Sequence, residues 1–177
     1  MEIYGNRYSE IGAQLSMLPN LREMLLYVTF PYDIDQSRMD VVTSVAHFLS
    51  TCPPRHQLKD MRLIFESVLI LTSADEVPQA IERVLKSGNW TALDSVLVSM
   101  TNSVTHVFKV GIHISIWHSI EPDESLEPVV REINAEYGNF LRGWGQKYLP
   151  RISASDSPNL DLKKSTQHGV YPVVDYD

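Results

Sequence analysis

The sequence predicts an α+β fold: a single compact domain in which an antiparallel sheet packs against two main helices, with an extended N-terminal arm and a C-terminal tail. First, apolar and polar residues alternate from Val104 to Trp117, which is typical of a strand with one face on a core and the other near water, as in antiparallel sheets. Second, apolar residues recur at helical spacing from Arg38 to Cys52 and again after Ser125. Third, 177 residues suffice for one domain with a sizeable core but hardly for two.

The two ends of the chain differ from its centre. Residues 1–20 mix apolar and polar side chains without a clean period, so we predict an N-terminal arm that is mobile, packs on its own domain, or docks on a neighbouring copy. The globular domain is expected at residues 21–149. Residues 150–177 are mostly polar and predict a tail, although the apolar run from Gly169 to Tyr176 could form an edge strand or a partner-docking segment.

The first half of the domain predicts strand, helix, strand. The alternation from Arg22 to Phe30 indicates a strand. Ser37 and Asp40 form a weak capping box for the helix that runs from Arg38 toward Cys52. The run from Met61 to Leu71 is apolar on both faces, as in a central strand that is covered on both sides.

The second half predicts two further helices before the long strand and a third helix after it. Val77–Ser87 has Gly88 just past its end and predicts a short helix. Thr91–Met100 suits either a helix or a hairpin, and we favour the helix. After the Val104–Trp117 strand, the acidic turn at residues 121–125 caps a long amphipathic helix that begins near Ser125.

Composition excludes some classes of protein. Hydrophobic residues make up 44% and charged residues 21%, which is ordinary for a globular chain. No apolar run approaches the roughly 18 residues of a membrane span, and the N-terminus lacks a signal-peptide pattern, so the cytosol or nucleus is the expected compartment. Cys52 is the single cysteine and is expected to act as a small apolar residue.

The motifs of common enzyme and cofactor sites are missing from the sequence. There is no dinucleotide-binding, phosphate-loop or nucleophile-elbow pattern, and no histidine spacing that suits zinc. His106 and His113 fall on opposite faces of the predicted strand, so they are not expected to share a metal. We therefore predict that the protein is not an enzyme and that it needs no cofactor or metal.

Basic residues form one candidate binding patch. The net charge of −7 argues against nucleic-acid or anionic-membrane binding by the molecule as a whole, so any such binding must come from local clusters. The simpler interpretation is that these charges are solvated and balance a helix C-terminus. The candidate residues are Arg142, Lys147, Arg151, Lys163 and Lys164.

The order of elements resembles that of rhabdovirus matrix proteins. The strand Leu25–Phe30, the helix Met39–Phe48 and the strand ending at Ala74 resemble the start of that family's folded core. The strand Gly111–Trp117, the Asp123–Glu127 turn and the helix that follows resemble its later part. The resemblance covers Leu25 to Tyr148, except for residues 75–103, and within the family we expect a plant-infecting, cytoplasmic cytorhabdovirus member.

The resemblance implies a matrix protein, which is structural and not an enzyme. Such a protein self-associates, condenses the viral nucleocapsid, and contacts the inner membrane leaflet and glycoprotein tails during budding, without a small-molecule substrate. It would lie between envelope and nucleocapsid in the virion, and in the cytoplasm and at cytoplasmic membranes of the host. The implied self-association residues are Tyr4, Tyr8, Ile11 and Leu15 of the arm. The basic patch would be its nucleocapsid- or lipid-binding surface.

This sequence departs from the family in three ways. The arm lacks a lysine-rich run, the net charge is acidic, and Pro53-Pro54 does not continue into a PPxY budding motif.

An alternative is a Bcl-2-like helical groove-binding regulator of host cell death, which the segments 88–90 and 137–146 resemble. The alternation from Val104 to Trp117 argues against that mostly helical fold.

Overall fold

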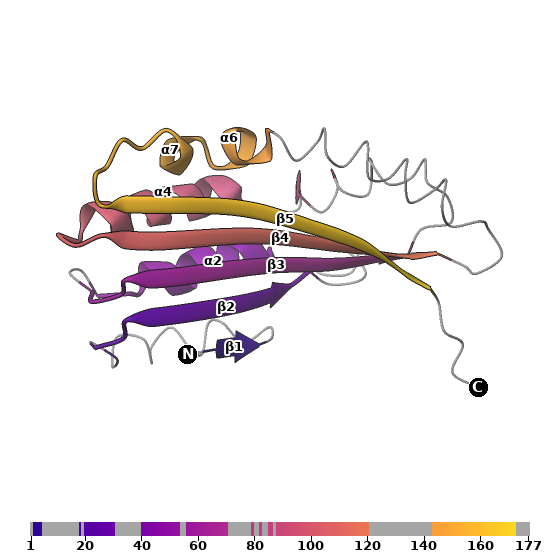
Figure 1. The fold of residues 1–177 in the computed structure, drawn as a ribbon, viewed down its shortest axis with the longest axis horizontal. Coiled ribbons are helices and arrows are strands. Elements are labelled where there is room, and N and C mark those ends of the chain that lie inside the picture. The colour runs from indigo at the N-terminus through magenta and orange to yellow at the C-terminus, as the bar shows by residue number, and fades with distance from the viewer. Residues whose placement is uncertain are drawn as a thin grey trace.

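The structure, a computed structural model, describes residues 2–4, 18, 20–30, 40–53, 56–70, 79, 82, 85–86, 88–120 and 143–172. These residues form a sheet of five parallel strands in the order β1-β2-β3-β4-β5 (Figure 1). Each strand pairs only with its neighbours in sequence. The strands are β1 Glu2–Tyr4, β2 Glu23–Thr29, β3 Asp60–Ile70, β4 Phe108–Ile120 and β5 Leu160–Pro172.

The prediction of an antiparallel sheet is wrong. Successive strands are parallel, and the described helices lie in the sequence between β2 and β3, between β3 and β4, and between β4 and β5. Right-handed crossovers in a sheet of sequential order bring every connecting helix to the same face. The other face then stays uncovered by those helices, so the strands alternate just as antiparallel strands do. The alternation therefore correctly predicted that one face of each strand is buried. It does not distinguish parallel from antiparallel strands.

Four described helices cover one face of the sheet. They are α2 Val41–Ser50, α4 Trp90–Asn102, α6 Trp144–Tyr148 and α7 Pro150–Ser153. In Figure 1, α2 and α4 lie side by side behind the sheet, and they contact each other. The short helices α6 and α7 contact α4 and each other, so they extend the same layer.

The core lies between this helical layer and the sheet. Alternate residues of β2, β3 and β4 point into it and are fully or nearly fully buried, whereas Leu160 and Leu162 of β5 are partly buried against it. Burying a side chain as large as Phe65 or Phe108 contributes about 1.5–3 kcal/mol. The inward-facing strand residues are Met24, Leu26, Val28, Met61, Leu63, Phe65, Phe108, Val110, Ile112 and Ile114.

Trp90 joins the sheet to the helices at one end of this core. Its ring centroid lies 5.0 Å from that of Phe65, 6.3 Å from Trp144 and 6.2 Å from Tyr148. Its Nε1 donates to the backbone carbonyl of Leu85 at 2.7 Å. Trp144 is buried and belongs to this core.

Two carboxylates fix the helix ends. Asp40 is the N-cap of α2, accepting from the Thr43 amide at 2.9 Å, and it also accepts from the amide of Asn89, the N-cap of α4, at 2.9 Å. Asp94 is buried on α4 and reaches α7, where its two oxygens accept from the amides of Arg151 at 2.9 Å and Ile152 at 2.8 Å. These amides belong to the first turn of α7, so Asp94 caps that helix from a distant part of the chain.

Several element predictions are confirmed. The strand expected at Arg22–Phe30 is β2, and the helices expected at Arg38–Cys52 and Thr91–Met100 are α2 and α4. The predicted capping box is corrected, because Asp40, which was expected inside the helix, is itself the N-cap of α2. The four described residues between positions 79 and 86 are helical, in agreement with the helix expected at Val77–Ser87.

Other element predictions are corrected. The strand expected from Val104 begins only at Phe108. The strand expected to be covered on both sides, β3, is covered on one side, because Arg62 on its other face is exposed. The polar tail predicted from residue 150 is wrong, because residues 150–172 supply α7 and the edge strand β5, whereas the edge strand proposed for Gly169–Tyr176 is confirmed as far as Pro172. The helix expected from Ser125 lies outside the described residues, as does most of the arm, although Glu2–Tyr4 pairs with β2 of its own chain.

Candidate functional site

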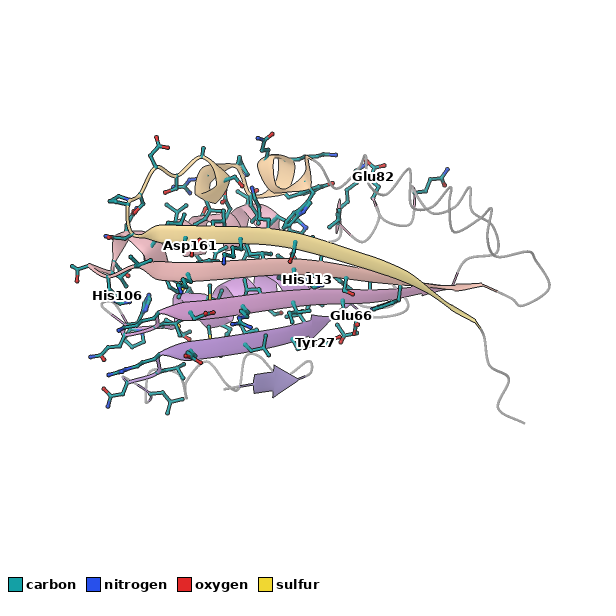
Figure 2. All side chains as sticks on the ribbon, in the orientation of Figure 1. Tyr27, Glu66, Glu82, His106, His113 and Asp161 are labelled. Atoms are coloured by element: carbon teal, nitrogen blue, oxygen red, sulfur yellow. The ribbon has the colours of Figure 1, made fainter. Side chains whose placement is uncertain are left out.

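One face of the sheet turns away from the helical layer, and we call it the open face. It carries the strand residues that alternate with the core positions, and no helix in the described part of the chain packs on it. Figure 2 labels four of these residues, one on each of β2 to β5: Tyr27, Glu66, His113 and Asp161. The register of the strands arranges them in rows that cross the sheet.

The centre of the open face combines apolar and polar side chains. Tyr27, Ile64, His113 and Ser165 form one row across four strands, and the first three are half-buried. Nδ1 of His113 and the hydroxyl of Ser165 are hydrogen-bonded at 2.8 Å. The row therefore offers a hydrocarbon surface at β2 and β3 and polar atoms at β4 and β5.

A second hydrogen bond crosses the open face nearer the carboxyl ends of the strands. Nε1 of Trp117 on β4 donates to Oε1 of Glu66 on β3 at 2.9 Å. Glu66 is thereby held against its neighbouring strand although it is only half-buried. The indole and carboxylate form a fixed polar border beside the central row.

The amino ends of the strands carry charged rows. Glu23, Asp60, Lys109 and Asp161 lie in register across β2 to β5. In the next row that points the same way, Arg62 of β3 and Lys163 of β5 flank Gly111 of β4. Neither Arg62 nor Lys109 was predicted as a binding residue, because Arg62 is a single break in an apolar run and Lys109 is an ordinary polar residue of an alternating strand.

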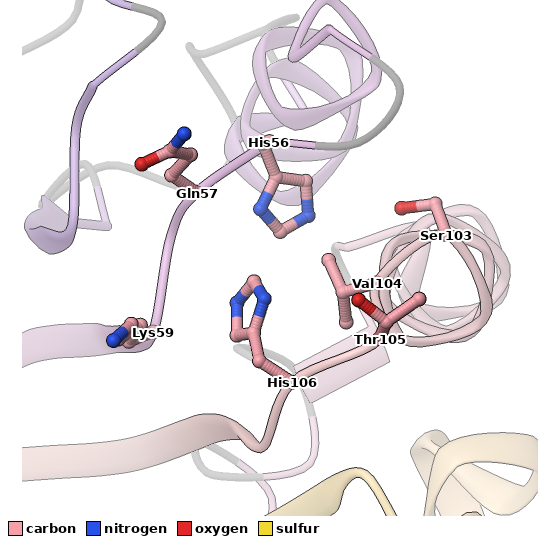
Figure 3. A pocket seen from close by; sticks show the side chains of 7 residues that line it. All are labelled: His56, Gln57, Lys59, Ser103, Val104, Thr105 and His106. Atoms are coloured by element: carbon pink, nitrogen blue, oxygen red, sulfur yellow. The ribbon is translucent and has the colours of Figure 1, made fainter.

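A pocket of about 480 Å³ lies at the amino ends of β3 and β4, between the segments that lead into these strands (Figure 3). In parallel α/β sheets, ligands bind mostly at the opposite, carboxyl ends of the strands. The residues that line the pocket are His56, Gln57, Lys59, Ser103, Val104, Thr105 and His106. Figure 3 shows the His56 and His106 rings facing each other across it.

Both histidines of the pocket bind the backbone of Leu58. The Leu58 amide donates to Nδ1 of His56 at 3.2 Å, and Nε2 of His106 donates to the Leu58 carbonyl at 2.9 Å. The His56 ring also stands edge-on to Phe108, with centroids 5.4 Å apart. The pair therefore ties the segment before β3 to the segment before β4.

The surroundings of His56 keep it neutral. Burial lowers its pKa below 6.5 and the neighbouring His106 lowers it further, while the backbone of Met100 acts in the opposite direction. Because Nδ1 accepts a hydrogen bond, the proton of the neutral ring sits on Nε2, which is buried without a partner of hydrogen-bonding geometry in the described residues. Such a ring suits a structural latch better than a general base.

The lone cysteine is chemically quiet. Cys52 is half-buried and packs against the core, and burial raises the pKa of its thiol to about 11. A thiol with this pKa stays protonated near neutral pH and is a poor nucleophile. Its surroundings agree with the prediction that it acts as a small apolar residue.

Metal ligands do not gather in the part of the chain that the structure describes. Within it, no group of three or more His, Cys, Asp or Glu residues is placed to hold an ion. His106 lies in the pocket before β4 and His113 on the open face of β4, so the prediction that they occupy opposite faces of one strand is wrong, because the strand begins only at Phe108.

The predicted basic patch is divided between the two sides of the sheet. Lys147 lies 5.1 Å from the centre of the Tyr148 ring on α6, and Arg151 of α7 donates to the hydroxyl of Ser95 at 2.8 Å. Lys164 also lies on this helical side, where its Nζ donates to the Ser153 hydroxyl at 3.0 Å. Lys163 points to the open face instead, because adjacent strand residues face opposite ways.

The remaining predicted site residues are the four of the N-terminal arm and Arg142. Tyr4 ends β1, whereas Tyr8, Ile11, Leu15 and Arg142 lie outside the described residues.

The segment that suggested a groove-binding helical protein has a structural explanation. Asn89 caps α4, and Trp90 belongs to the core. Gly88 packs so closely on Val42 that a Cβ placed on it would come within 2.9 Å of the valine Cβ.

Comparison with protein-family models, with curated protein sequences and with solved structures finds no match to this chain. None of the described helices is long and apolar enough to span a membrane.

Proposed function

We propose that this protein is a non-catalytic protein-binding module whose partner docks on the open face of the sheet. The supporting observation is the sequential order of the parallel strands, each of which pairs only with its neighbours in sequence. Because the connecting helices then cover one face of the sheet, the half-buried apolar side chains of the open face are left available to another protein. The prediction that the protein is not an enzyme stays a prediction.

The composition of the open face supports this role. Binding surfaces of proteins combine aromatic and aliphatic anchors and arginines with a polar rim. The central row supplies Tyr27 and Ile64 as half-buried anchors. Arg62 and the charged row at the amino ends of the strands lie beside them.

A matched pair of variants tests the proposal. Ile64→Glu places a charge at the centre of the open face, and Ser99→Glu places the same charge at an exposed position of α4 on the helical side. Partners captured from a cell extract by the immobilised chain are compared by quantitative mass spectrometry, after circular dichroism confirms folding. We expect a specific partner to bind the wild type and Ser99→Glu equally and to be lost with Ile64→Glu. Equal loss with both variants, or with neither, would contradict docking on the open face.

A self-assembling matrix protein is the second candidate. The observation that favours it is β5, which spans 13 residues and pairs with β4 alone among the described strands. An edge strand offers unpaired amides and carbonyls to a second copy, and head-to-tail pairing of edges gives open assemblies. In this proposal the protein lines a viral envelope, condenses the nucleocapsid, and acts in the virion and at host cytoplasmic membranes.

Sedimentation velocity over a wide range of protein concentration separates the two candidates. A matrix protein should form larger species as concentration rises and should pellet with a viral nucleocapsid. A chain that stays monomeric at every concentration would rule against self-assembly and leave docking of a different protein as the better proposal.

A further inference from the structure

Three basic side chains surround the position of Gly111, which has no side chain, on the open face near the amino ends of the strands. Arg62 and Lys163 lie in register on either side of Gly111, and Lys109 precedes Gly111 by two residues on the same face. All three basic side chains are exposed. We call Arg62, Lys109, Lys163 and Gly111 the basic cradle.

Gly111 leaves space for a ligand between the two flanking side chains. Strands in a sheet lie about 4.8 Å apart, so the backbones of Arg62 and Lys163 are about 10 Å apart across Gly111. A Cβ on Gly111 would stand 3.5 Å from Cγ of Arg62, which shows that the arginine stem borders the gap. A carboxylate seated above Gly111 could therefore receive hydrogen bonds from Arg62 and Lys163 together.

The charges of the basic cradle are only partly neutralised. Nε of Arg62 lies 3.4 Å from Oδ1 of Asp60 at an exposed position. In the described part of the chain, neither Lys109 nor Lys163 forms an ion pair, although Lys109 has Asp60 and Asp161 as its row neighbours. Positive charge thus remains available in a molecule whose net charge is −7.

The surroundings favour a single carboxylate over a polyanion. Asp60 and Asp161 on one side and Glu66 on the other would repel the further phosphates of a nucleic acid or an anionic membrane. The half-buried side chains of Tyr27 and Ile64 lie one row beyond the cradle and suit an apolar side chain. An acidic residue followed by an apolar one matches both features.

We propose that the basic cradle binds the carboxylate of an acidic segment in a partner protein, with a neighbouring apolar side chain of that segment against Tyr27 and Ile64. This inference rests on the proposed docking of a protein on the open face. It adds the chemistry that selects the partner.

Fluorescence anisotropy with two labelled peptides tests the inference. One peptide alternates glutamate with leucine over six residues, and the other replaces each glutamate with glutamine. We expect the wild type to bind the glutamate peptide about tenfold more tightly, because only its carboxylates can form charge-assisted hydrogen bonds with the basic cradle, and the difference should shrink as salt rises. Equal binding of the two peptides would overturn the inference.

Three variants and one control locate the binding. Arg62→Gln and Lys163→Gln should each weaken binding of the glutamate peptide several-fold, and Gly111→Val should do so by filling the gap. Lys147→Gln removes the same charge from the helical side and should leave binding unchanged. A Lys147→Gln effect as large as that of Lys163→Gln would overturn the inference, as would tighter binding of a uridine hexanucleotide than of the glutamate peptide. Circular dichroism melting confirms that each variant folds.

The capture experiment distinguishes this inference from the proposal on which it rests. If Ile64→Glu abolishes partner capture while Arg62→Gln and Lys163→Gln leave both capture and peptide binding unchanged, selection of acidic segments is wrong and open-face docking stands. If Ile64→Glu has no effect on capture, docking on the open face is itself wrong.

Discussion

Replacing Asp94 with alanine should destabilise the protein strongly, although the residue lies far from the open face. Its carboxylate is 1% exposed and accepts from the backbone amides of Arg151 and Ile152. Alanine would leave both donors without this partner. The Ile152 bond is buried, and an unpaired buried donor costs about 1–3 kcal/mol, whereas the Arg151 amide is half-buried and costs less, so we expect a loss of about 1–4 kcal/mol. Asp94→Asn keeps one acceptor oxygen and should lose roughly half as much.

Urea denaturation followed by circular dichroism measures these losses. Asp156→Ala is the control, because it removes an exposed carboxylate from the loop after α7 and should change the free energy of unfolding by less than about 0.5 kcal/mol. Hydrogen exchange at the Arg151 and Ile152 amides should quicken in Asp94→Ala. A loss below about 0.5 kcal/mol for Asp94→Ala would refute the capping role and the placement of α7 against α4.

Three further predictions concern the core, the pocket and the cysteine. Gly88→Ala should lower the free energy of unfolding, measured by urea denaturation, by about 1–3 kcal/mol, because the new methyl group presses on the buried Val42. Gly143→Ala is the control: no atom lies within 4 Å of its new methyl group, so its free energy of unfolding should not fall in this way. Folding lowers the pKa of His56, so the neutral ring contributes stability that is present above pH 6.5 and is lost as the pH falls through the folded pKa. In His56→Gln the thermal melting temperature should therefore depend less on pH over that range. An unchanged pH profile would contradict this prediction. The Cys52 thiol, with a pKa of about 11, should react slowly with a thiol reagent at pH 8 until the protein is unfolded, and rapid reaction in the folded state would count against its burial.

The positions of β2, α2 and α4 were predictable because the burial pattern of each element is visible in its own stretch of sequence. In β2 the apolar residues repeat every second position, and in α2 and α4 they repeat every three or four. Strand direction was not contained in those patterns. The predicted helices between strands were the better indicator, because strands that alternate with helices usually form parallel sheets.

The strand β5 and the open face show where sequence reasoning could not reach. Lys163 and Lys164 made the start of β5 look like a polar tail, and only pairing with β4 makes it a strand. Arg62, Lys109 and Lys163 lie far apart in the sequence and meet only through the register of parallel strands. The joint binding of Leu58 by His56 and His106 likewise depends on two loops that tertiary structure brings together.

Docking on the open face is tested most directly by site-specific photo-crosslinking. A benzophenone amino acid replaces Ile64 on the open face in one variant and the exposed Ser99 on the helical side in another, and both are irradiated in the same cell extract. We predict that the Ile64 variant forms a discrete adduct with a partner protein, and that addition of the glutamate–leucine peptide suppresses it, while the Ser99 variant forms none. The same adduct from both variants, or an adduct from Ser99 alone, would contradict the account.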